Sequence, residues 1–172
     1  LQGSGLQTAA LMFTGFFPGP TYTTLNESWN GSSWTELADT NTGRSAGAGF
    51  GLTNTAAIIA GGEPGTLADV ESWNGTSWTE VNNLNTARLG SGGAGSSTNG
   101  LVFGGAPNPK AQTEAWDGTS WTEVADLAQA RNTLGGAGTA SAALAIGGAI
   151  PPNSALTEEW TFVHPIKTVT TS

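Results

Sequence analysis

The chain has 172 residues and a mass of 17.3 kDa, with 13 acidic residues against five basic ones and a net charge of −8. Hydrophobic residues make up 37% and include 7 Trp, which excludes a disordered chain and predicts one folded domain over residues 1–172. Because the basic residues are scattered, the chain has no Cys and no run of 18 apolar residues occurs, we expect no nucleic-acid binding, no thiolate site and no membrane insertion.

One segment recurs along the chain with few changes. Its copies span 27–37, 71–81 and 114–124, and the second is Glu71-Ser-Trp-Asn-Gly-Thr-Ser-Trp-Thr-Glu-Val81. The first Trp of the segment recurs at positions 29, 73, 116 and 160, in steps of 44, 43 and 44 residues. The second Trp recurs at 34, 78 and 121, and an Arg follows ten residues after each of these. Such repetition at one period is typical of repeat architectures.

Each repeat predicts four short β-strands in a fixed order. A Gly/Ala/Ser-rich strand, as at 92–96 and 135–140, is followed by an apolar run that ends in Gly-Gly, at 58–62, 101–105 and 144–148, with a degenerate copy at 11–15. The third strand ends at the first Trp, as at 68–73, and the fourth begins at the second Trp, as at 78–81. Asn-Gly or Asp-Gly lies between these two strands and tolerates the positive φ angles of tight hairpins. No helical period is present, so the pattern predicts an all-β fold.

A period near 43 residues with four strands per unit is typical of a β-propeller blade. The Gly-Gly that ends the second strand, the paired Trp residues and the Arg before the next unit resemble kelch repeats over essentially the whole chain. We therefore expect a β-propeller of about four kelch-like, four-stranded blades, at approximately 1–42, 43–86, 87–129 and 130–172. The amino-acid sequence of the repeat also resembles the kelch-like repeat proteins of marine bacteriophages, and this resemblance implies a virion structural or tail-associated protein.

Familiar kelch propellers have six or seven blades, whereas this chain has about four. Three arrangements of the four blades are therefore open. The chain forms a small four-bladed ring, completes a ring with another copy as a homo-oligomer, or is part of a longer array. The absence of an initiator Met is in keeping with the last alternative. The small residues of the first strands favour a tight centre, so we expect the four blades to close within one chain. The fourth strand of the last blade is expected at 166–171.

The repeated residues are predicted to be structural. We expect the repeated Glu to pair with the repeated Arg and the Trp to pack between blades, burying about 150–250 Å² each, rather than to form a sugar platform. The set comprises Trp29, Trp34, Trp73, Trp78, Trp116, Trp121, Trp160, Arg44, Arg88, Arg131, Glu27, Glu71, Glu114 and Glu158. A glycosidase needs one asymmetric carboxylate pair, whereas these carboxylates recur in each copy.

No catalytic or metal site is expected. A kelch-type copper oxidase needs two His, a Tyr and a Cys, but the chain has only His164 and Tyr22. We therefore expect no enzyme activity, no cofactor and no metal site.

The loops between the second and third strands differ in every copy and contain Pro, and they share one end of the propeller. We expect them to form a recognition surface, with Phe16, Phe17, Tyr22, Pro64, Lys110 and Pro151 as contact residues; drift in tolerant loops is the alternative. The resulting hypothesis is a virion or extracellular module, such as a tail fibre or capsid decoration, that binds a host-surface glycan or neighbouring virion proteins. The alternatives are a cellular kelch-type protein-interaction adaptor and, more remotely, a glycan-active enzyme.

Overall fold

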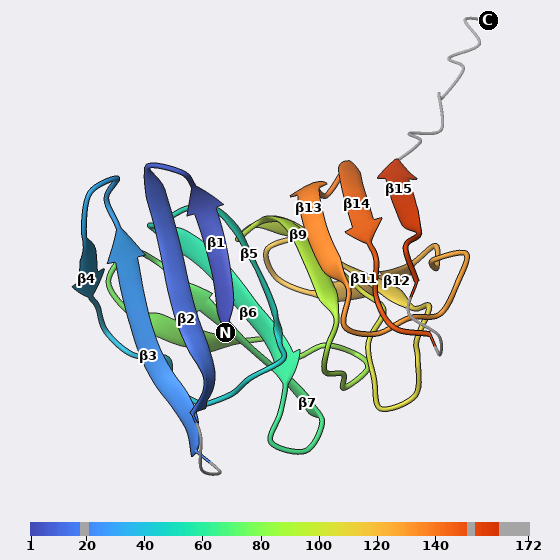
Figure 1. Ribbon diagram of the computed structural model, residues 1–172, viewed down its shortest axis with the longest axis horizontal. Helices are drawn as coiled ribbons and strands as arrows, with labels where there is room; N and C mark the ends of the chain where they lie inside the picture. Colours follow the sequence, from blue (N-terminus) through green and yellow to red (C-terminus); the bar gives the residue numbers. More distant parts are fainter. Residues whose placement is uncertain (18–20, 151–153, 162–172) are drawn as a thin grey trace, which may run out of the picture.

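The computed structural model describes residues 1–17, 21–150 and 154–161, and it confirms an all-β fold, a β-propeller of four blades (Figure 1). Blade 1 contains β1 (Gln2–Leu6), β2 (Ala9–Phe17), β3 (Thr21–Trp29) and β4 (Trp34–Glu36). Blade 2 contains β5 (Ala48–Thr53), β6 (Ala56–Gly62), β7 (Leu67–Trp73) and β8 (Trp78–Val81). Blade 3 contains β9 (Gly92–Ser96), β10 (Asn99–Phe103), β11 (Thr113–Trp116) and β12 (Trp121–Val124). Blade 4 contains β13 (Gly135–Thr139), β14 (Ala142–Ile146) and β15 (Thr157–Thr161).

Each sheet is antiparallel and its strands follow the order of the chain. The described part of blade 4 has three strands, and the fourth strand expected at 166–171 lies outside the described residues. The first strands β1, β5, β9 and β13 are innermost, and they line a central cavity of about 470 Å³. No helix among the described residues is long and apolar enough to cross a bilayer.

The hydrophobic core lies between neighbouring blades. Each sheet presents one apolar row to the blade before it and a second to the blade after it, so both faces of the two middle sheets are buried. Leu11 and Phe13 of blade 1 pack against Ile59, Trp73 and Trp78 of blade 2, and the Phe13 and Trp78 rings meet edge to face at 5.0 Å. Similar clusters join blade 2 to blade 3 and blade 3 to blade 4. Adjacent blades therefore depend on each other for their stability, as in other repeat proteins.

The small residues of the inner strands allow these strands to approach closely. A Cβ on Gly93 would lie 2.7 Å from the Phe50 ring of the preceding inner strand, and one on Gly136 would collide with the Gly93 backbone. The Gly/Ala/Ser-rich composition of these strands is thus a packing requirement.

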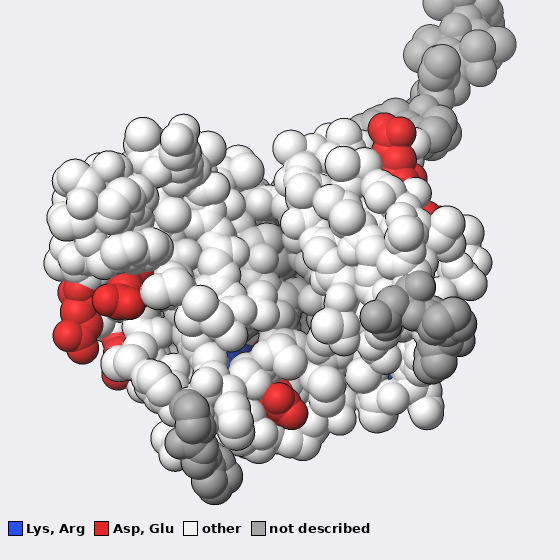
Figure 2. Space-filling view, in the orientation of Figure 1, with Lys and Arg blue, Asp and Glu red and all other residues white. Residues whose placement is uncertain are grey.

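We expected the four blades to close into a ring, but the ring is not closed within the described residues. Strand β1 packs on β5, β5 on β9 and β9 on β13, but no comparable packing joins β13 to β1. All five residues of β13 are exposed, whereas four of the five residues of β9 are buried. Figure 2 shows a hollow between blade 1 on the left and blade 4 on the right. Small inner strands permit tight packing, but they do not fix the angle between blades on which closure depends.

The hairpins between the last two strands of blades 1 to 3 have the four-residue length that the spacing of the two Trp predicts. Trp73 pairs with Trp78, which leaves four residues in the turn, and only Gly75 has positive φ, at 94°. The Asn74 side chain instead accepts hydrogen bonds from the N–H groups of Thr76 and Ser77. Its carboxylate counterpart Asp117 accepts the same two bonds, and these donors hold its pKa below the usual range of an aspartate.

Replacing Gly75 by Ala should lower the free energy of unfolding by about 1–2 kcal/mol, because a residue with a Cβ is strained at this φ. The matched control is Thr76→Ala in the same turn, whose φ is not positive and which should change stability little. Urea unfolding of both variants measures the difference. Equal stability of Gly75→Ala and the parent would contradict the observed turn conformation.

Candidate functional site

The repeated Arg and Glu residues form three ion pairs, as the sequence predicts. The pairs are Arg44–Glu71 at 2.6 Å, Arg88–Glu114 at 2.6 Å and Arg131–Glu158 at 2.7 Å. Each Arg lies in the linker from one blade to the next, four residues before the first strand of that next blade, and each Glu lies on the third strand of the same blade. The pairs therefore attach each linker to the sheet that it enters.

The surroundings of these pairs satisfy most of the buried polar atoms. Glu71 also accepts hydrogen bonds from the backbone N–H groups of Asn41 and Thr42. Arg44 Nη1 donates to the carbonyls of Gly61 and Asp69, so one guanidinium joins two strands of blade 2. The blade 3 pair is built in the same way. A buried ion pair is tolerated when such bonds complete it.

Burial carries an electrostatic cost that is visible at Arg88. Desolvation lowers the pKa of its guanidinium, and the facing carboxylate of Glu114 opposes this shift. Arg44, Arg88 and Arg131 are all fully buried, and hardly any blue surface is visible in Figure 2. Three of the five basic residues of the chain are thus withdrawn from any external ligand.

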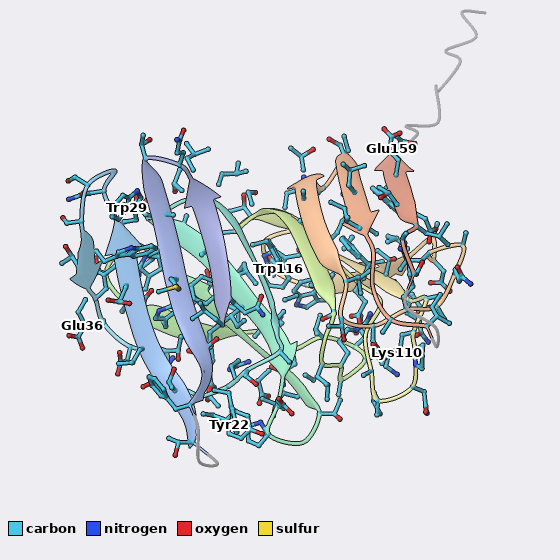
Figure 3. All side chains as sticks on the ribbon, in the orientation of Figure 1. Tyr22, Trp29, Glu36, Lys110, Trp116 and Glu159 are labelled. Atoms are coloured by element: carbon cyan, nitrogen blue, oxygen red, sulfur yellow. The ribbon has the colours of Figure 1, made fainter. Side chains whose placement is uncertain are left out.

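The Trp pairs of blades 2 and 3 are packing residues. Trp73, Trp78, Trp116 and Trp121 are buried between blades, whereas Trp34 of blade 1 is 45% exposed and Trp29 is half-buried. Figure 3 places Trp116 in the middle of the molecule and Trp29 towards its outer edge. Trp160 of blade 4 is half-buried against the core shared with blade 3.

Glu27 is the exception among the repeated carboxylates. It is half-buried on β3 and forms no ion pair among the described residues. With Leu1, Met12 and Leu25 it lines a cavity of about 360 Å³ on the side of blade 1 that faces away from blade 2. The cavity lies within the size range of ligand sites, and its lining is apolar apart from the carboxylate and two Thr hydroxyls.

The loops between the second and third strands share one end of the molecule with the linkers. Isolated bridges join linker residues to these loops at Ser45 with Glu63, Leu89 with Ala106 and Asn132 with Ala149. This end is the lower one in Figure 1. Two of the loops contain a cis peptide bond at equivalent positions, before Pro64 and before Pro107.

The predicted contact residues occupy this end to different extents. Phe16, Phe17 and Tyr22 were expected in the first loop, but Phe16 and Phe17 end β2 and Tyr22 lies on β3, because the hairpin pairing continues to Phe17 and Thr21. Phe16 and Phe17 are 56% and 53% exposed, and the Phe16 ring meets the half-buried Tyr22 ring edge to face at 5.4 Å. Pro64 is exposed on the β6–β7 loop, and Lys110 is half-buried on the β10–β11 loop. Figure 3 shows Tyr22 and Lys110 at the same end, opposite to Glu159. Pro151 lies outside the described residues.

Sequence reasoning missed two features of these sites. The linker residues Asn41 and Asn85 donate their side-chain amides to the carbonyls of Trp78 and Trp121, and a repeated Asn three residues before the Arg was the available signal. The cavity beside Glu27 was also missed, because it arises only where no blade covers the sheet.

Most of the repeated carboxylates lie in ion pairs or on exposed outer strands in the part of the chain that the structure describes. No group of three or more His, Cys, Asp or Glu side chains there could hold a metal ion. Glu71 and Glu114 are buried by their Arg partners, and the second repeated set, Glu36, Glu80 and Glu123, is exposed on outer strands. The chain matches no protein-family model and no curated protein.

Replacing Arg88 by Ala should lower the free energy of unfolding by about 2–4 kcal/mol, because Glu114 is then left buried and unpaired. The measurement is chemical denaturation of the purified variant. Lys110→Ala is the control, since Lys110 is half-buried and belongs to no ion pair between described residues. An unchanged midpoint for Arg88→Ala would refute the structural role of the pair.

Proposed function

We propose that the protein is a non-enzymatic virion component, a tail-fibre or capsid-decoration module, that binds a host-surface glycan or a neighbouring virion protein through its variable loops. Its blades belong to the kelch type on this proposal. The viral assignment rests on the resemblance of the repeated Trp and Asn-Gly segments to kelch-like phage proteins. On the same basis we propose that the protein is located on the virion, outside cells.

The observation that carries the recognition role is the contrast between constant and variable positions. Arg44, Arg88, Glu71 and Glu114 are buried in ion pairs that attach each linker to the next blade, so these repeated charges are not free to bind a ligand. The variable loops differ in sequence in every copy, and the end of β2 at the lower end of the molecule in Figure 1 carries the exposed rings of Phe16 and Phe17. Binding residues commonly lie on such loops, held by a rigid scaffold.

Exposed aromatic rings favour a glycan or protein ligand over a charged one. Aromatic side chains combine an apolar face with little loss of conformational freedom, and they are enriched where proteins bind partners. The visible surface in Figure 2 carries few charges, so the loops offer shape and apolar contact rather than an electrostatic field.

A glycan array probed with the labelled protein should give binding that falls at least tenfold in the variants Phe17→Ser and Tyr22→Ser, because each removes aromatic contact area from the loop end. Glu36→Gln is the matched control, since Glu36 is exposed on the outer strand β4 and distant from the loops in Figure 3. Loss of binding in the control together with retention in both loop variants would refute the recognition surface.

Membership of a virion is tested separately. Purified phage particles from the source culture should contain the protein, as detected by peptide mass spectrometry and by immunogold labelling on the tail or capsid surface. Its presence in host-cell fractions but never in particles would refute the viral role and favour the adaptor alternative, whatever the loops bind.

A further inference from the structure

The two terminal blades each present a face that is buried in the middle blades. We define the leading face as the exposed side of blade 1, with Met12, Leu25, Glu27, Trp29 and Trp34. These residues occupy the sheet positions that in blade 2 include Ile59, Glu71, Trp73 and Trp78, as the pairing of Ala10 with Trp29 and of Ala57 with Trp73 shows. Trp78 is only 5% exposed against blade 1, whereas Trp34 is 45% exposed.

We define the trailing face as the exposed side of blade 4, with Ala137, Leu144, Ile146, Thr157 and Glu159. The pairing of Ala143 with Trp160 aligns Leu144 and Ile146 with Leu101 and Phe103 of blade 3, which are buried against blade 4. On blade 4 the same positions are 39% and 43% exposed.

We infer that a second copy of this chain docks head to tail, its trailing face against the leading face of the first. The same kind of interface forms three times within the chain, between each pair of consecutive blades. The leading and trailing faces correspond to the two sides of this interface. Leu144 and Ile146 of one copy would pack on Trp29 and Trp34 of the next, as Leu11 and Phe13 pack on Trp73 and Trp78.

A repeat array is normally capped by polar outer faces, but both end faces of the described propeller are largely apolar. Trp34, Leu25, Leu144 and Ile146 stand exposed on faces that would be solvated in a monomer. Large exposed apolar patches of this kind mark interaction surfaces. The blade before the leading face is not supplied by blade 4 of the same chain, since β13 and β1 make no comparable packing within the described ranges.

One polar contact specifies the register of this docking. At the first internal interface the Asn54 amide donates to the Ser28 hydroxyl at 3.0 Å. Glu159 occupies the Ser28 position on the trailing face, because Trp29 and Trp160 are equivalent. Gln7 occupies the Asn54 position on the leading side, since each supplies the carbonyl that accepts the indole N–H of the following Trp. The Gln7 amide of one copy can therefore donate to the Glu159 carboxylate of the other.

The interface is heterologous, so the assembly is a ring if its rotation closes and a filament if it does not. This inference does not rest on the proposed function, because it uses only the faces of the terminal blades.

Light scattering over a concentration series tests the inference. The parent should exceed its monomer mass of 17.3 kDa increasingly with concentration, whereas Trp34→Asp and Ile146→Asp should each remain monomeric. Mixed in equal amounts, these two variants should form a complex of one chain each, since each keeps the face that the other lacks. Leu52→Asp is the matched control on an exposed apolar residue of β5 that belongs to neither face, and it should behave as the parent.

Three outcomes would overturn the inference: a parent that stays monomeric throughout, an oligomer that both variants leave intact, or an oligomer that only one of them disrupts, as a symmetric contact would give. Circular dichroism checks that each variant is folded.

A second measurement stands even if Trp34→Asp fails to fold. The chain has no Cys, so a disulfide can form only where Cys is introduced. Gln7→Cys and Glu159→Cys chains should crosslink when mixed under oxidising conditions, and neither should crosslink alone. A disulfide confined to single chains of the double variant would mean that the four blades close on themselves, and would overturn the inference.

Discussion

The burial of one guanidinium at each blade junction is the constraint on which the rest of this propeller depends. Arg44 reaches Glu71 and the carbonyls of Gly61 and Asp69, while the backbone of Asn41 and Thr42 donates to the same carboxylate. Linker and two strands are thus fixed around one charge. A hydrophobic replacement could be equally stable, but it would not specify which segments must meet. The Trp and Ile side chains pack between the sheets that these linkers connect.

The sequence predicts the blades well because their determinants are local and repeated. Trp73 and Trp78 mark the ends of two strands, and the Gly61-Gly62 pair marks the end of another, so the strand order follows from spacing alone. The length of the turn follows from the spacing of Trp73 and Trp78, but its hydrogen bonds do not. Asn-Gly is compatible with a two-residue hairpin, yet the side chain of Asn74 bonds to the N–H groups of Thr76 and Ser77 and stabilises a four-residue turn. That choice depends on the pairing of the two Trp, which a dipeptide does not encode.

The sequence predicted which residues pair at the blade junctions, but it did not predict whether the ring closes. The common period of Arg88 and Glu114 indicated a pair, and the structure joins them. Closure of the ring was not predictable, because it depends on a small angle that accumulates over three junctions. Neither the free faces nor the cavity beside Glu27 has a local signature, since Glu27 and Trp34 stand in the same sequence context as Glu71 and Trp78. Only the position in the array distinguishes them.

The two kinds of surface on this protein adjoin at blade 1, where Phe16 and Phe17 line the cavity beside Glu27, and they are separate in blades 2 and 3. The proposed docking faces are the sides of the terminal blades, whereas the variable loops of blades 2 and 3, at 63–66 and 104–112, lie at one end of their sheets (Figure 1). A head-to-tail partner would cover Trp34 and Ile146 while leaving the Pro64 and Lys110 loops uncovered. Each added copy would therefore extend the row of loops at the same end. Weak binding at a single loop becomes strong when several loops engage one surface, because later contacts form at high effective concentration. A scaffold with constant junctions and divergent loops is suited to such multivalent binding.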